Sequence, residues 1–266
     1  MTGLYRRVLP LVGAAVVLVV LGVGLGWGYA GDAAPVAPSS VALTTAGASA
    51  SSVTGSWPAR RARRAPTSFL VADAVVPQVA LYAAPDQPLP GALPMANPTW
   101  EGLPVLFLVL DRKPGWLHVR VSRRPNDLTA WVPTSEVHLR RVPNRIVVSV
   151  GARRITVYHG DQVLLEETVA VGRPNTPTPL GHFFVDGIVQ VPNSGGPYGP
   201  FQVSVSGFSN VLHSFGGGVG QIALHGTNQP QLLGQPVSNG CIRMSNDTIT
   251  RVETLAPLGT PVTVVA

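Results

Sequence analysis

Short valine-rich runs, separated by glycine and proline, fill the chain after residue 67 and limit the possible fold more than any other feature. The chain holds 29 glycines and 26 prolines in 266 residues, and only 12% of its residues are charged. Glycine and proline interrupt helices, and few charges are left to solvate helix surfaces. A coiled coil or helical bundle is therefore excluded, and the plentiful Val, Leu and Ile exclude a wholly disordered chain. We expect a mostly β protein.

Residues 8–30 form an uncharged stretch of 23 residues that directly follows two arginines. At about 1.5 Å per residue this stretch spans a hydrocarbon core of about 30 Å, and it exceeds the apolar region of a secretory signal, about 7 to 15 residues. We predict residues 1–30 to be a cytoplasmic stub and transmembrane signal anchor, because the arginines lie on its N-terminal side. A signal cleaved near residues 28–30 is the alternative. Both place the rest of the chain on the extracytoplasmic side of the cell membrane.

Residues 31–67 consist largely of Ala, Ser, Thr, Pro and Gly, and we predict a disordered linker because they cannot bury enough apolar surface to fold. The formal net charge is +6, with four arginines gathered at residues 60–64. No zinc-finger or RNA-binding signature accompanies these charges, so we expect no nucleic-acid partner. An anionic membrane surface or cell wall is the expected neighbour.

Residues 68–141 contain short apolar runs with turn signals between them. In residues 116–121 the apolar Leu117, Val119 and Val121 alternate with larger polar or aromatic side chains, the period of a half-buried strand. The run from Gly115 to Val121, followed by Arg-Pro-Asn and Ala-Trp-Val-Pro, resembles a bacterial SH3-like module. That resemblance implies a small β barrel. Wall binding and a role as structural spacer both remain open for it.

Residues 143–266 read as a second β-rich segment with one helix near its end. Gly160-Asp161 predicts a hairpin turn, and Ser245-Asn-Asp247 supplies N-cap oxygens for a helix over residues 248–255. Strands are expected within residues 146–150, 154–158, 163–171, 183–185, 202–205, 221–224 and 262–265.

Cys241 is the one cysteine of the chain, so no disulfide within the chain is possible. It lies in Ser238-Asn239-Gly240-Cys241-Ile-Arg243, and a second notable stretch is His225-Gly226-Thr227. A thiol is mostly protonated at neutral pH, and a histidine that reaches the sulfur takes the proton and holds the ion pair. Gly240 leaves room beside the nucleophile, and the amides of Gly240 and Cys241 are candidates for an oxyanion hole. The following helix start favours a thiolate.

Together these two stretches, sixteen residues apart from His225 to Cys241, resemble the active-site motif of YkuD-type L,D-transpeptidases. Thr-Pro-Thr-Pro-Leu-Gly-His-Phe at residues 176–183 resembles the stretch that precedes this motif in the family, and the similarity covers about residues 143–266. Asn239 departs from the pattern, because the family often has histidine there. The departure removes one candidate proton carrier and leaves His225 as the expected base.

The resemblance implies that Cys241 attacks the third residue of a peptidoglycan stem tetrapeptide. The thioester is then resolved by the side-chain amine of a second stem, giving a 3→3 cross-link. His225 would be the general base, and Arg243 would pin the loop or meet a substrate carboxylate. Other candidate substrate contacts are Ser238, Asn239, Gly226, Thr227 and Tyr198, the last on a possible flap between two Gly-Pro pairs.

No cofactor is expected, and no metal site, because the cysteine and histidines lack a recognised ligand spacing. Resolution of the thioester by water would make a carboxypeptidase, and resolution by a protein amine would attach protein to the wall. A non-catalytic wall-binding protein is the alternative from another class.

Overall fold

A computed structural model describes residues 64–266. The predicted anchor and nearly all of the predicted linker lie outside these residues. Among residues 64–266, no helix has the length and apolar character needed to cross a membrane.

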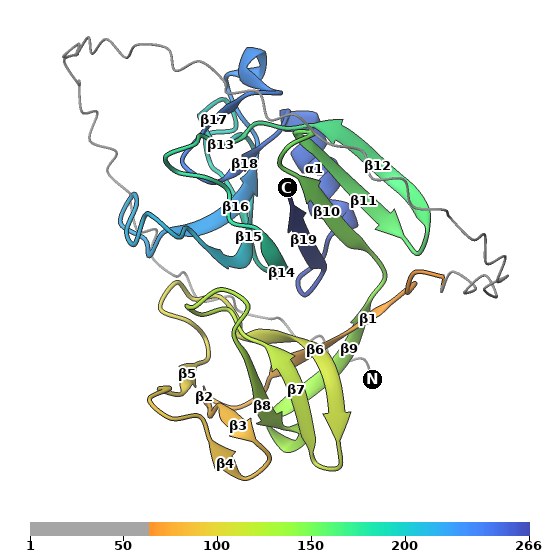
Figure 1. The fold of residues 1–266 in the computed structure, drawn as a ribbon, viewed down its shortest axis with the longest axis vertical. Coiled ribbons are helices and arrows are strands. Elements are labelled where there is room, and N and C mark those ends of the chain that lie inside the picture. The colour runs from red at the N-terminus through yellow and green to blue at the C-terminus, as the bar shows by residue number, and fades with distance from the viewer. Residues whose placement is uncertain (1–63) are drawn as a thin grey trace, which may run out of the picture. The chain divides into compact units, whose positions relative to one another are not determined.

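Residues 69–142 form an antiparallel sheet with the strand order β4-β3-β8-β7-β6-β1-β9 (Figure 1). The strands are β1 (Phe69–Ala74), β3 (Tyr82–Ala84), β4 (Gln87–Pro88), β6 (Leu106–Lys113), β7 (Trp116–Arg120), β8 (Thr129–Pro133) and β9 (Val137–Val142), with a separate pair of β2 (Gln78–Val79) and β5 (Met95–Ala96) and a short helix η1 (Thr134–Glu136). The predicted alternation in β7 is confirmed, since Leu117 and Val119 are fully buried while Trp116 and His118 are not. We call residues 69–142 the β module. Its likeness to an SH3-like module stays a prediction.

Residues 145–265 build the second sheet, with the order β12-β11-β10-β19-β14-β15-β16-β18. Its strands are β10 (Arg145–Ser149), β11 (Arg154–His159), β12 (Gln162–Thr168), β14 (Gly181–Gln190), β15 (Phe201–Phe208), β16 (Gln221–His225), β18 (Ile242–Arg243) and β19 (Pro261–Val265), with a separate pair of β13 (Val171–Gly172) and β17 (Pro236–Ser238) and a short helix η2 (Pro230–Leu232). The hairpin at Gly160 is confirmed, because β11 and β12 pair antiparallel around it and Gly160 has φ +56°.

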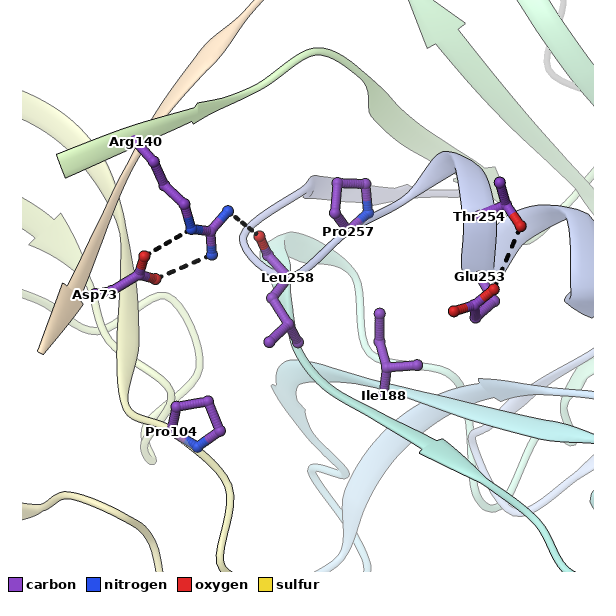
Figure 2. Close-up of a pocket in the computed structure, with 8 residues that line it drawn as sticks. All are labelled: Asp73, Pro104, Arg140, Ile188, Glu253, Thr254, Pro257 and Leu258. Atoms are coloured by element: carbon purple, nitrogen blue, oxygen red, sulfur yellow. Dashed lines mark hydrogen bonds and ion pairs between the residues drawn. The ribbon is translucent and has the colours of Figure 1, made fainter. Parts of the chain in front are cut away.

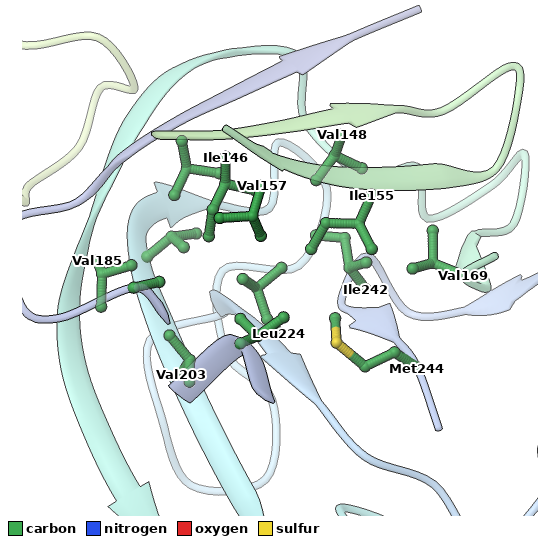
Figure 3. Close-up of a cluster of buried hydrophobic side chains, with 14 of the residues drawn as sticks. Ile146, Val148, Ile155, Val157, Val169, Val185, Val203, Leu224, Ile242 and Met244 are labelled. Carbon is green, nitrogen blue, oxygen red and sulfur yellow. The ribbon is translucent and has the colours of Figure 1, made fainter. Parts of the chain in front are cut away.

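The single α-helix of the described residues, α1 (Asn246–Leu255), confirms the helix predicted late in the chain. Ser245 is its N-cap, and the Ser245 hydroxyl accepts the Thr248 amide proton at 3.1 Å. One face of the helix buries Ile249 and Val252 in the cluster drawn in Figure 3, which also contains Leu224 of β16 and Ile242 of β18. The apolar core therefore includes residues of β16, which carries His225, and of β18, which directly follows Cys241.

The run at residues 163–171 was expected to be one strand, and it is two. β12 ends at Thr168, and Ala170 then pairs with Arg243 instead of continuing beside β11. β13 pairs with β17 in the parallel direction. The strand ends at Thr168 because the following residues pair with the segment near Cys241, and the local sequence contains no turn signal at this point.

The β module and the second sheet share apolar and polar contacts within the described unit. Val71, Leu108 and Val142 of the module form one buried cluster with Phe184 of β14. Asp186, also on β14, accepts hydrogen bonds from Ser122 of the module, from Ser204 (2.7 Å) and from Gln221 (2.7 Å). Burial raises the pKa of Asp186, and these hydrogen bonds act in the opposite direction.

A pocket of about 710 Å³ marks another part of this seam (Figure 2). At its edge, Arg140 of β9 pairs with Asp73 of β1 at 2.6 Å and donates to the Leu258 carbonyl at 2.9 Å. Because the guanidinium is occupied by these partners and none of the predicted site residues lines the pocket, the chemistry must be sought elsewhere.

Candidate active site

The loop that carries Cys241 is fixed by hydroxyl groups. Ser238 donates its hydroxyl proton to the Cys241 carbonyl (2.6 Å) and accepts the Gly240 amide proton (3.1 Å). Thr178 donates to the Gly240 carbonyl and accepts from the Gly172 amide, both at 2.9 Å. Ser238 is fully buried and holds the loop through these bonds, and its predicted substrate contact stays a prediction.

Gly240 has φ +116°, a conformation that favours glycine. A Cβ there would lie 3.0 Å from Ile222 Cδ1, so the position also lacks room. The Gly240 amide was expected to serve the oxyanion hole, but in this loop it is directed at the Ser238 hydroxyl. No hydrogen bond from the Cys241 amide is found within residues 64–266, which leaves this amide as the better oxyanion donor.

Strand pairing brings His225 and Cys241 to one face of the sheet. β16 and β18 run parallel, with Leu224 beside Ile242 and His225 beside Arg243. Paired residues share a face and side chains alternate along a strand, so Cys241, two residues before Arg243, faces the same side as His225. Leu224 and Ile242 point to the opposite side, into the apolar core.

His225 is held as a neutral base. Its Nδ1 lies 2.6 Å from the Gly226 carbonyl, which can only accept, so Nδ1 carries the proton and Nε2 is left as the acceptor. The pKa of His225 is lowered to about 4, chiefly by burial; the Gly226 hydrogen bond raises it and the Arg243 charge lowers it. Above that pH the imidazole is ready to accept a proton.

Cys241 is a protonated thiol in this environment. Burial of the sulfur raises the pKa of Cys241, although the residue as a whole is partly exposed. A backbone hydrogen bond from Ala223 and the Arg243 charge act in the opposite direction. The expected thiolate–imidazolium ion pair is therefore not favoured at rest, because desolvation penalises both charges. The neutral thiol and the neutral imidazole are the forms that this environment favours.

Arg243 holds the loop through its backbone hydrogen bonds, so its side chain is not needed for that role. Its amide and carbonyl exchange hydrogen bonds with Ala170 at 2.9 and 2.8 Å. Its Nε is buried and has no hydrogen-bond partner among the described residues. The two roles foreseen for Arg243, loop pin and anion contact, are therefore compatible in one residue.

Tyr198 lies over His225, with ring centroids 5.0 Å apart and an angle of 57° between the planes. Burial raises the pKa of Tyr198. The segment that carries Tyr198 can approach the His225 turn closely because Gly199 and Gly226 have no side chains. A Cβ on Gly199 would lie 2.6 Å from Gly226 Cα. Gly226, expected to contact substrate, serves this packing.

Thr227 was also expected to contact substrate, but it is buried and accepts the Gln229 amide proton at 3.0 Å. Its own amide donates to the Asn246 side chain at 3.0 Å, and Asn246 Nδ2 donates to the Ser194 carbonyl at 3.3 Å. Asn246 therefore ties the His225 turn to the segment that carries Tyr198. Sequence reasoning saw Asn246 only as a source of capping oxygen, since its partners lie 19 and 52 residues away.

Asn239 holds an arginine of the neighbouring loop. Arg173 donates from Nη2 to Asn239 Oδ1 at 2.7 Å and from its backbone amide to the Ser238 carbonyl at 3.0 Å. The Thr176 hydroxyl also donates a hydrogen bond to the Ser238 carbonyl, at 3.2 Å. These contacts fit the expectation that Asn239 shapes the loop.

We expect Asn239→Ala to slow acylation of Cys241 by about one to two orders of magnitude, the scale of an oriented hydrogen bond lost from a site. Arg173→Gln removes the same hydrogen bond from its other side. The effects of the two changes should therefore fall short of additivity in the double variant. Acylation rates on one donor peptide check this, and full additivity would show that the Arg173–Asn239 contact does not matter for the rate.

Known proteins match this part of the chain. The L,D-transpeptidase catalytic domain (YkuD) family matches residues 143–264. YqjB of Bacillus subtilis, whose name marks it as a candidate L,D-transpeptidase, is 31% identical over 125 residues, 44% of this chain and 68% of that protein. The chain belongs to the YkuD L,D-transpeptidase family. The predicted family resemblance is confirmed for the catalytic domain.

Another curated relative and one solved structure also match this part of the chain. YkuD of Bacillus subtilis is 36% identical over 123 residues, 46% of this chain, and the match spans 66% of that protein's length, just under two thirds. L,D-transpeptidase 3 from Mycobacterium tuberculosis is 19% identical, covering 54% of this chain and 76% of that one with a TM-score of 0.39. The β module lies outside the family match. Within residues 64–266 no group of three or more metal-ligating side chains is found.

Proposed function

We propose that the chain forms 3→3 cross-links between peptidoglycan stem peptides through a thioester on Cys241. L,D-transpeptidases of this family act on such stems. The observation that carries the proposal is the β16–β18 register, which puts a neutral His225 with a free Nε2 on the same face as the Cys241 thiol.

In the first half-reaction the Cys241 sulfur attacks the carbonyl of the third stem residue while its proton passes to His225 Nε2. The Cys241 amide donates to the oxyanion that develops. The imidazolium then gives this proton to the nitrogen of the terminal D-alanine, the C–N bond breaks, and the D-alanine leaves. The desolvated site disfavours charge at rest, so the imidazolium is short-lived.

In the second half-reaction a side-chain amine of another stem attacks the thioester carbonyl. An incoming ammonium first releases one proton to solvent. The attacking nitrogen then loses a second proton to His225, the C–S bond breaks, and His225 returns that proton to the sulfur. The products are an amide cross-link and the free Cys241 thiol.

The buried Nε of Arg243 supports a role in donor binding, because donor stems carry carboxylates and a planar guanidinium pairs well with them. Residues 1–30 are proposed to anchor the chain in the cell membrane with the catalytic domain outside the cytoplasm. The β module is proposed to be SH3-like, with wall binding or spacing as its task.

The test uses the purified full chain and a synthetic stem tetrapeptide. We expect a mass increase on Cys241 equal to the acyl group of the tripeptide, release of D-alanine, and a 3→3 dimer in the products. Tripeptide without dimer would make the chain a carboxypeptidase. Failure to release D-alanine from any stem would contradict the proposal.

A further inference from the structure

A second cavity, of about 210 Å³, is lined by residues of β14, β15 and β16. Its floor includes Gln202, Ser204 and Gln221. Glu101 and Leu103 of the β module form one wall. The cavity is thus built from both parts of the described chain.

The cavity opens beside the catalytic pair. Ala223, which lines it, lies two residues before His225 on β16, and its backbone is hydrogen-bonded to the Cys241 sulfur. Gln202, which also lines it, is the cross-strand partner of His225 in the β15–β16 register. Partners in an antiparallel pair and residues two apart share a face, so the cavity and the reacting groups lie on one side of the sheet.

The loop that presents Glu101 is firmly held. Glu101 lies in a turn in which the Gly102 amide donates to the Thr99 carbonyl at 2.9 Å and the Thr99 amide donates to the Leu103 carbonyl at 2.8 Å. Leu103 then packs on β14, since a Cβ on Gly187 would lie 2.8 Å from its Cδ1. The closed turn and the Leu103 contact therefore hold the backbone of Glu101 beside the sheet, and Glu101 lines the cavity from there.

Charge differs between the cavity and the segments that surround Cys241. Among the described residues that line the cavity, Glu101 is the one charged side chain, and it is exposed. The segments around Cys241 carry two cations, the exposed Arg173, which is bonded to Asn239, and Arg243, whose buried Nε has no hydrogen-bond partner among the described residues. These arginines suit a stem rich in carboxylates. The cavity offers one carboxylate and neutral amide and hydroxyl groups, the set that receives an ammonium.

We propose that this cavity binds the side-chain ammonium of the acceptor stem and that Glu101 of the β module is its counter-ion. The proposal rests on the proposed function. It gives the module a part in choosing the amine that resolves the thioester. Glu101 recruits the acceptor, and the chemistry of the thioester remains with His225 and Cys241.

The test measures the two half-reactions separately on the full chain. The donor is a stem tetrapeptide, and the acceptor is a stem tripeptide that ends in diaminopimelate. We expect Glu101→Gln to raise the KM for the acceptor about fivefold, the effect of one partly exposed ion pair. We expect the rise to shrink as salt increases from about 0.05 to about 0.5 M. The matched control is Asp111→Asn, which removes an exposed carboxylate of the same module outside the cavity and should leave the acceptor KM unchanged.

The outcomes separate the two proposals. Absence of the Cys241 adduct in the unaltered chain would defeat the proposed function. If the adduct forms but Glu101→Gln leaves the acceptor KM unchanged, the acceptor site is wrong. Slower acylation by the donor, with an unchanged acceptor KM, would place the donor in this cavity and also overturn the assignment. A stem tripeptide whose side-chain amine is acetylated cannot resolve the thioester; used as an inhibitor competing with the acceptor, it should inhibit the unaltered chain and Glu101→Gln equally, and a clear difference between the two would contradict the counter-ion role.

Discussion

Replacing Cys241 by serine should abolish both the acyl adduct and cross-linking, with a loss of at least about four orders of magnitude in rate. A hydroxyl is far less acidic than a thiol, and removal of a nucleophile commonly costs this much or more. A carbapenem, to which the family resemblance implies reactivity, supplies a second readout by mass. The Cys241→Ser chain should show no mass increase with either the carbapenem or the stem tetrapeptide.

The fold of the Cys241→Ser chain should be unchanged, because Ser238 and Thr178 hold the loop through the backbone of residues 240 and 241. Circular dichroism and thermal unfolding provide this control. A mass increase on any residue other than Cys241 in the unaltered chain would show that the nucleophile has been assigned to the wrong residue.

Replacing His225 by alanine should slow acylation about 10² to 10⁴-fold, the usual contribution of a general base, and more than Asn239→Ala does. In the unaltered chain the pKa of about 4 predicts a pH profile with a low-pH limb. His225 is protonated below pH 4, so the rate should fall about tenfold per pH unit there. Between about pH 5 and 7 the base is neutral and the rate should stay nearly level.

Initial acylation rates across pH 3 to 8 check this profile, and the apparent values belong to the Cys241–His225 pair. His225→Ala should lose the limb near pH 4. A limb near pH 6.5 in the unaltered chain would show that His225 is solvated and not buried as described. An Asn239→Ala chain as inactive as Cys241→Ser, with His225→Ala still turning over, would reverse the two roles.

Local patterns predicted much of the fold. Three features could be predicted because each depends on only a few neighbouring residues: the alternation in β7, the Gly160 hairpin and the capped helix α1. β1 and β9 were not foreseen, although they pair with each other over six positions. Their residues are separated by about seventy positions, and β9 carries His138, Arg140 and Arg141, which hide its strand character. Only the partner strand shows why that segment is extended.

The reactive pair could be predicted as residue types at a motif spacing, but their protonation states could not. Desolvation of His225 and Cys241 depends on the core beneath β16 and β18 and on Tyr198, which comes from another segment. The same limit applies to Ser238, Gly226 and Thr227, because only the folded site shows that they are buried and make internal contacts; their substrate contacts stay predictions. Asn246 was missed because its function lies in joining segments that are distant along the chain.

Because Asp186 of the catalytic sheet is bonded to Ser122 of the β module, the two parts are not independently exchangeable domains. A graft that moves residues 143–266 onto another carrier would uncover Phe184 and take Ser122 from a carboxylate that is already desolvated. The graft would also leave Glu101 behind, and with it one wall of the cavity beside Cys241. Chimeras of this chain should therefore be cut near residue 68, so that the β module travels with the catalytic sheet.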